Sequence, residues 1–150
     1  YAYAYFFTDG RGTEEALAIY RRNFRPSADH AQPLATICVW ALAADTEAEA
    51  RRLLTTREHW RVGFEKGLRT PLVSPEAAAL HPYTDAERAV IQRLRERAIA
   101  GTADQVAAKL AALAASFGLD EIVINTWTYD PVARQRSYEL IAQAMLRVHG

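Results

Sequence analysis

The sequence predicts an α/β fold in which about three parallel strands alternate with helices. Three segments are rich in β-branched and aromatic residues, and each is followed by a segment with helical periodicity. The strand segments are mostly apolar, which favours a sheet covered on both faces. Strands that alternate with helices pair in parallel and connect by right-handed crossovers. The 150 residues are treated as a single segment, with no internal repeat.

The first strand candidate covers residues 1–7, where aromatic side chains recur at alternate positions. The second covers residues 34–44 and contains Thr, Ile, Val and Trp. The third covers residues 121–128, which read EIVINTWT. The chain therefore opens directly in a strand, and we expect it to be part of a longer protein. Three strands leave two unpaired edges, so we expect a homodimer or a swapped assembly that covers them.

Helix boundaries are predicted from capping residues and glycines. Thr13 is expected to cap a helix that Pro26 ends near residue 25. Residues 61–83 are less regular, because glycine and proline interrupt the helical pattern. After the second strand either Asp45 or Thr46 is expected to cap the next helix, and Thr46 has capping-box spacing to Glu49. Further helix starts are predicted at Ser74 with Pro75, Thr84 with Glu87, Thr102 with Gln105, and Asp130 with Pro131. The helix from Thr84 is expected to reach about residue 100, and Gly118 is expected to end the one from Thr102.

Composition narrows the class of protein. Eighteen basic residues balance eighteen acidic ones and half of the chain is hydrophobic, which excludes a disordered chain and a broadly basic nucleic-acid binder. Cys38 is the only cysteine, so no disulfide forms within the chain, and a cytoplasmic location fits. The longest apolar runs are too short to span a bilayer, and no signal peptide is recognised. We expect neither a nucleic acid nor a membrane as partner.

Sequence motifs exclude several kinds of site. The four histidines have no metal-ligand spacing, so no metal site is expected. Neither a nucleophile elbow nor a Walker or Rossmann glycine loop occurs. In a parallel sheet, however, ligands bind at the carboxyl ends of the strands. Tyr5, Trp40, Asn125 and Trp127 lie near such ends and are the predicted pocket-lining or cofactor-binding residues. Aromatic side chains there suit a flat ring system, and burial in the core is the alternative role.

Four segments together resemble the bacterial-luciferase-like flavin-dependent monooxygenases. Residues 41–50 (ALAADTEAEA) resemble a late strand and helix start of that family, and residues 98–106 (AIAGTADQV) resemble its G-[ST]-P-E-x-V helix start. Residues 119–130 and 134–140 resemble its last strand and helix. The order and spacing of these segments carry the resemblance, which covers essentially the whole chain. Ala103 departs from the family, which often has proline there.

The resemblance implies a partial (β/α)₈ TIM barrel, with this chain as the C-terminal portion that contains the sixth to eighth strands. For the complete protein it implies oxygenation of a small organic substrate by O₂ with reduced FMN, which a separate flavin reductase supplies. A deazaflavin is the other cofactor found in relatives. Some relatives carry a catalytic His and Arg at positions that correspond to Trp40 and Cys38 here. Neither residue can replace them, so no catalytic residue is assigned.

The resemblance also implies that the chain is incomplete and inactive alone, because the first five strands carry much of the flavin contact in the family. The alternative is a stand-alone small α/β binding or interaction module without catalysis. Further β-α units encoded upstream favour the first interpretation. Stable FMN binding by these residues alone favours the second.

Overall fold

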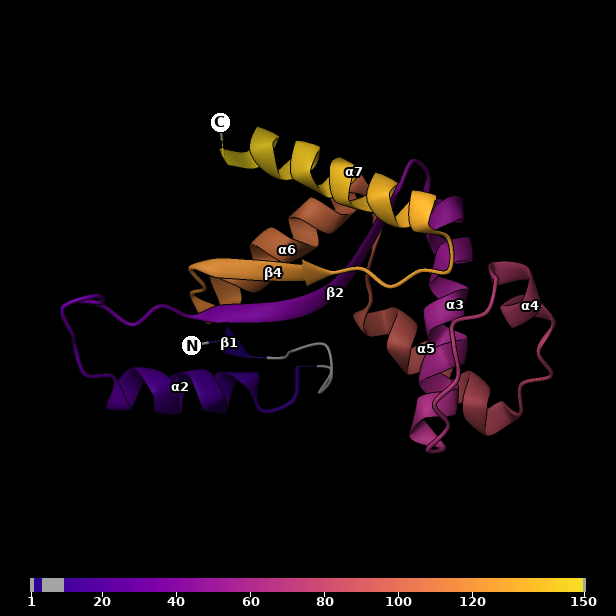
Figure 1. The fold of residues 1–150 in the computed structure, drawn as a ribbon, viewed down its shortest axis with the longest axis horizontal. Helices are drawn as coiled ribbons and strands as arrows, with labels where there is room; N and C mark the ends of the chain where they lie inside the picture. The colour runs from indigo at the N-terminus through magenta and orange to yellow at the C-terminus, as the bar shows by residue number, and fades with distance from the viewer. Residues whose placement is uncertain (1, 4–9, 150) are drawn as a thin grey trace. The chain divides into compact units, whose positions relative to one another are not determined.

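A computed structural model describes residues 2–3 and 10–149 as an α/β fold, and every strand pairing among these residues is parallel (Figure 1). The chain divides into two units. The first contains residues 1–40 and 108–125, and the second contains residues 41–107 and 126–150. Strand β2 (Thr36–Ala44) and helix α6 (Ala103–Phe117) contribute residues to both units. The parallel α/β architecture agrees with the sequence prediction.

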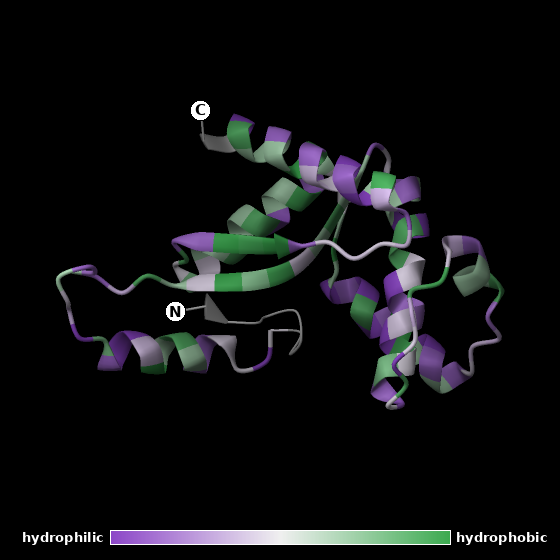
Figure 2. Cartoon of the chain, viewed as in Figure 1, coloured by the Kyte–Doolittle hydropathy of each residue, from purple (hydrophilic) through white to green (hydrophobic). Residues whose placement is uncertain are grey.

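The first unit is built around the start of β2. Strand β1 (Ala2–Tyr3) pairs with β2 in the register Ala2↔Thr36, and β4 (Glu121–Asn125) pairs with β2 from Thr36↔Glu121 to Trp40↔Asn125. Figure 2 shows that hydrophobic residues predominate along β2 and in the middle of β4. The buried core of this unit comes from α2, β2, the residue before β2, and α6, and it includes Leu17, Ala35, Ile37, Val39, Trp40 and Leu110.

Helix α2 (Thr13–Asn23) begins one residue earlier than the capping pattern predicts. Its N-cap is Gly12, which has a φ of 77°, a left-handed conformation that glycine adopts without strain. Thr13 is the first helical residue and is buried, so the prediction that it caps the helix is wrong. The Arg21 side chain donates to the carbonyls of Phe117 and Gly118, at 2.7 and 2.6 Å, and so ties α2 to the end of α6. The helix ends at Asn23, before residue 25.

The second unit holds the end of β2, the start of α6 and a group of helices. These are α3 (Glu47–Glu65), α4 (Pro75–Leu80), α5 (Asp85–Arg97) and α7 (Pro131–His149). Strand β3 (Ile99–Thr102) pairs with β2 from Ala41↔Ile99 to Ala44↔Thr102. All five residues from Trp40 to Ala44 are buried, as expected for a strand covered on both faces.

Most predicted helix starts are confirmed by hydrogen bonds. Thr84 and Glu87 form a reciprocal capping box, and Thr102 and Gln105 exchange the same two bonds at 2.9 and 3.4 Å. The side chains of Thr46, Ser74 and Asp130 each accept a backbone N–H in the first turn of α3, α4 and α7, at 3.1, 3.2 and 2.8 Å. Gly118 has a φ of 56°, and the Leu119 N–H bonds to the Ala114 carbonyl at 3.0 Å, as in a glycine C-cap.

Besides the ends of α2, four element boundaries differ from the prediction. The third predicted strand ends at Asn125 rather than at residue 128, and β2 begins at Thr36. Helix α5 ends at Arg97, and the next residues form the strand β3, which the sequence analysis missed. Helix α3 continues to Glu65, into the segment expected to be irregular. Of the predicted strand over residues 1–7, only residues 2–3 lie within the described residues.

Candidate functional site

The segment that follows β4 leaves the sheet and is held by hydroxyl groups. In the second unit, Thr126 Oγ1 donates to the Ala41 carbonyl at 2.8 Å, and the Thr126 N–H donates to the Tyr138 hydroxyl at 2.9 Å. The Ala43 N–H donates to Ser137 Oγ, also at 2.9 Å. Thr126 and Ser137 are both buried. Buried backbone groups need hydrogen-bond partners. The hydroxyls of Thr126 and Ser137 supply them to Ala41 and Ala43, where a neighbouring strand would otherwise do so.

Trp127, directly after Thr126, contacts Trp60 of α3, and Trp60 in turn contacts Phe64 of the same helix, so the three rings form an aromatic cluster. The Trp60 and Trp127 ring centroids lie 5.0 Å apart at an interplanar angle of 81°, an edge-to-face arrangement. The Trp60 and Phe64 rings lie 4.9 Å apart. All three rings are half-buried. Such pairs contribute about 0.5–1.5 kcal/mol beyond the area they bury, so the cluster holds the segment after β4 against α3.

Cationic and polar groups border this cluster. The Arg69 guanidinium lies 4.1 Å from the Phe64 ring centroid, and that of Arg61 lies 5.8 Å from it. Thr128 Oγ1 is buried and has no hydrogen-bond partner among the described residues. A buried hydroxyl without a partner costs about 1–3 kcal/mol, which a bound molecule with a polar edge can offset. The segment after β4 therefore carries one ring of the cluster, Trp127, and a buried hydroxyl without a partner among the described residues, that of Thr128.

Ion pairs connect α3 to α5. Arg95 of α5 binds Glu58 through two nitrogen–oxygen contacts of 2.7 and 2.9 Å, and Glu58 is only 2% exposed. The hydrogen bond to Glu58 raises the pKa of Arg95. Lys66, just after α3, pairs with Glu87, and together with the bonds from Thr84 this lowers the pKa of Glu87 to about 2. These pairs fix α5 against α3.

Three rings fill the space beside those ion pairs. His59 lies edge-on to His81, with ring centroids 4.9 Å apart, and His81 lies 4.6 Å from Tyr83. Burial lowers the pKa of His59, and the neighbouring His81 lowers it further, against the opposing effect of Glu87. Burial raises the pKa of Tyr83. These ring contacts pack α3 against the segment between α4 and α5.

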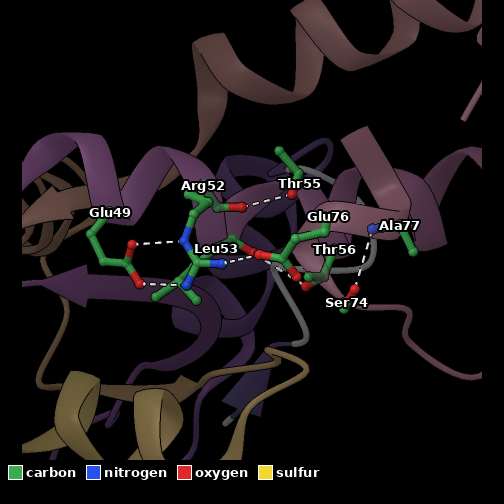
Figure 3. Close-up of polar contacts among 8 residues, drawn as sticks. All are labelled: Glu49, Arg52, Leu53, Thr55, Thr56, Ser74, Glu76 and Ala77. Atoms are coloured by element: carbon green, nitrogen blue, oxygen red, sulfur yellow. Dashed lines mark hydrogen bonds and ion pairs between the residues drawn. The ribbon is translucent and has the colours of Figure 1, made fainter. Parts of the chain in front are cut away.

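Helix α4 is attached to α3 through Arg52 (Figure 3). The Arg52 guanidinium binds Glu49 at 2.8 and 2.9 Å and reaches Glu76 of α4 at 2.6 Å. These side chains are exposed, so each pair contributes at most about 1 kcal/mol. The arrangement aligns α4 with α3, and the Arg52 guanidinium contributes to the lowered pKa of both Glu49 and Glu76.

The structure separates the predicted site residues into different settings. Tyr5 lies outside the described residues. Trp40 and Asn125 are neighbours in the β2–β4 register of the first unit; Trp40 is 4% exposed and Asn125 is half-buried. Trp127 belongs to the second unit and joins the aromatic cluster. The assignment of these four residues to a pocket stays a prediction.

Sequence analysis missed Trp60 and Phe64. Phe64 falls within residues 61–83, which were expected to be irregular, and Trp60 directly precedes them, although their spacing of four residues places both on one face of a helix. That spacing next to a confirmed cap at Thr46 is the signal that could have identified them. Among the described residues, no group of three His, Cys, Asp or Glu side chains is arranged to hold a metal ion. Within the same residues, no helix has the length and apolar character needed to cross a bilayer.

No family model matches this chain. The protein YceB of Bacillus subtilis is 33% identical over 146 residues, which cover 97% of this chain and 44% of YceB. N-acetyl-S-alkylcysteine monooxygenase of Bacillus subtilis is 30% identical over 151 residues, covering 97% of this chain and 43% of that enzyme. A luciferase-like monooxygenase of Escherichia coli K12 is 29% identical over 126 residues, covering 84% and 38%.

A solved structure agrees with these sequence matches. The crystal structure of apo-MsnO8 superposes with a TM-score of 0.82 at 30% identity, over 97% of this chain and 44% of that one. The chain thus spans less than half of the length of each of these relatives.

Proposed function

We propose that this chain, a homologue of the luciferase-like monooxygenases over 84–97% of its length, is the C-terminal part of a flavin-dependent monooxygenase. The observation that carries the proposal is the sequence similarity to two proteins named as monooxygenases, of which this chain covers only 38% and 43%. The activity is therefore assigned to a complete protein. We propose that the 150 residues alone do not turn over substrate, and that β1, β2 and β4 are the sixth to eighth strands of a (β/α)₈ barrel.

The residues of the second unit fit a flat ring system. The aromatic cluster offers half-buried ring surfaces, and the buried Thr128 hydroxyl lacks a partner among the described residues. A flavin ring is flat and apolar on its faces and polar at its edge, so it matches both features. Trp60 and Trp127 are the residues proposed to contact the ring, with Trp40, Asn125 and Tyr5 as further pocket residues. Bound reduced FMN supplies the electrons that activate O₂, and a deazaflavin remains the second choice of cofactor.

The protein's own contribution is orientation and exclusion of water. Trp127 is fixed at its backbone by Thr126 and at its ring by Trp60, so it presents a rigid apolar surface. Rigid apolar side chains around a binding site exclude water, and this exclusion prevents side reactions with solvent. No general acid or base is assigned, and oxygen transfer to a small organic substrate is proposed to depend on position rather than on proton transfer by this chain.

The proposal includes partners. A separate flavin reductase supplies reduced FMN, and O₂ and a small organic substrate complete the reaction. Each of β1, β3 and β4 pairs only with β2 among the described residues, so each leaves an edge that another strand can cover. We propose a homodimer or swapped assembly for the chain when it is alone, and a cytoplasmic location for the complete protein.

The test begins with the complete reading frame. The encoding DNA is expected to continue upstream with about five further β-α units. The complete protein, supplied with FMN, NADH, a flavin reductase and a panel of small thioethers under ¹⁸O₂, is expected to yield a product that carries one labelled oxygen by mass spectrometry. Absence of label from every product contradicts the proposed activity. Turnover or tight FMN binding by the 150 residues alone supports a stand-alone module instead.

A further inference from the structure

Two hydrogen bonds mark the place where β4 separates from β2. In the first unit the ladder ends at Trp40↔Asn125. In the second unit, the Ala41 carbonyl accepts from Thr126 Oγ1, and the Ala43 N–H donates to Ser137 Oγ. Residues two apart in a strand point their backbone groups to the same edge. Both hydroxyls therefore serve one edge of β2, where a continued strand would otherwise bond.

Thr126 is bound at two atoms on either side of its Cα. Its hydroxyl donates to Ala41, and its N–H donates to the Tyr138 hydroxyl of α7. Its side chain is 2% exposed, so no water competes for these bonds. Because Thr126 is held at both its backbone and its side chain, the direction in which the chain continues after it is fixed. The next residue is Trp127, whose ring meets Trp60 edge-on at 5.0 Å.

From these contacts we propose that Thr126 is a positioning residue for the ligand-binding face of the aromatic cluster. Its hydroxyl ends the strand and turns Trp127 out of the sheet and against Trp60, which sets the surface offered to a flat heteroaromatic ring. The identity of that ring rests on the proposed function; the positioning itself does not. Sequence patterns alone treat Thr126 as an ordinary strand residue, because threonine is common in strands.

Two substitutions of Thr126 distinguish a role in positioning Trp127 from a role in packing alone. Thr126→Val keeps the shape of the side chain but removes the hydroxyl, and Thr126→Ser keeps the hydroxyl but removes the methyl group. A role in packing alone predicts that serine is the worse substitution. Positioning predicts that valine is worse, because it leaves the buried Ala41 carbonyl without its partner. Tyr138→Phe removes the second bond to Thr126 at a residue that is 40% exposed, where the fold tolerates the change.

The measurement is the exciton couplet in far-ultraviolet circular dichroism, which arises when two indole rings lie close in a fixed orientation. Trp60→Phe defines the signal of the pair, since it removes one of the two rings. Thr126→Val and Tyr138→Phe are expected to lose most of the couplet in the 150-residue chain, and Thr126→Ser is expected to retain it. A couplet of unchanged size in Thr126→Val, or its loss in the serine variant alone, overturns the proposal.

A second readout connects positioning with binding. In the complete protein, Thr126→Val is expected to weaken FMN binding about tenfold, while Thr126→Ser stays near the unsubstituted protein. If the complete protein binds no FMN, the proposed function fails, and the couplet still decides the positioning role in the absence of any flavin. If FMN binds the valine variant with unchanged affinity, Thr126 does not set the ligand-binding face.

Discussion

Trp40 and Trp127 were predicted for the same task, but the structure gives them different surroundings. Trp40 lies inside β2, is 4% exposed, and is followed by four buried strand residues. Trp127 lies two residues beyond the end of β4, is half-buried, and contacts the half-buried Trp60. A tryptophan within a strand that continues becomes part of the core. One that follows the end of a strand can retain an accessible ring face.

The largest expected effect separates these two tryptophans by stability. Trp40→Ala is expected to lower the free energy of unfolding by about 3–5 kcal/mol, because it removes a buried ring and leaves a cavity. Trp127→Ala is expected to cost only about 1–2 kcal/mol, because its ring is half-buried. Urea unfolding of both variants measures the difference. Equal losses would remove the distinction between a core and a surface tryptophan.

The next effect compares a buried ion pair of α3 with exposed ones on the same helix. Arg95→Met leaves the buried Glu58 carboxylate without its guanidinium partner and is expected to cost about 2–3 kcal/mol. Arg52→Met is the matched control, since it breaks exposed pairs on the same helix and is expected to cost at most about 1 kcal/mol. Thermal and urea unfolding compare the two. A control as damaging as Arg95→Met would show that burial does not distinguish these ion pairs.

A smaller effect depends on pH. The pKa of Glu87 is lowered from 4.5 to about 2 by its bonds to Lys66 and Thr84. A carboxyl with a lowered folded-state pKa stabilises the fold fully above its unfolded value and loses that contribution as the pH falls through the folded one. The stability difference between the unsubstituted chain and Glu87→Gln is therefore expected to shrink between pH 4.5 and about 2. A difference that stays constant across this window contradicts the role of the charge.

Capping residues in the sequence were sufficient to predict most of the helix starts. Serine, threonine and aspartate caps act within four residues, so Thr84 with Glu87 and Asp130 could be identified without tertiary information. The parallel α/β class followed from the alternation of strands and helices. Gly12 in place of Thr13 as the cap of α2 was missed, because the left-handed conformation that favours glycine is not visible in the pattern.

The remaining features depend on contacts that are distant in sequence. Strand β3 has four residues, too few to show a period, and exists through its pairing with β2. Gly101 within it has a φ of 151°, and a Cβ there would collide with the Gln105 side chain that caps α6. Residues 126–128 have strand composition but leave the sheet, because the Thr126 hydroxyl bonds to Ala41, 85 residues away in sequence. The contact between Trp127 and Trp60 follows from that departure.

The most direct test of the central claim is acrylamide quenching of tryptophan fluorescence. Trp60→Phe/Trp127→Phe leaves emission from Trp40 alone, and Trp40→Phe leaves emission from the Trp60 and Trp127 pair. We expect weakly quenched, blue-shifted emission from Trp40 and strongly quenched emission from the pair. Equal quenching, or stronger quenching of Trp40, would contradict the claim that the segment after β4 presents an accessible aromatic surface while β2 buries its tryptophan.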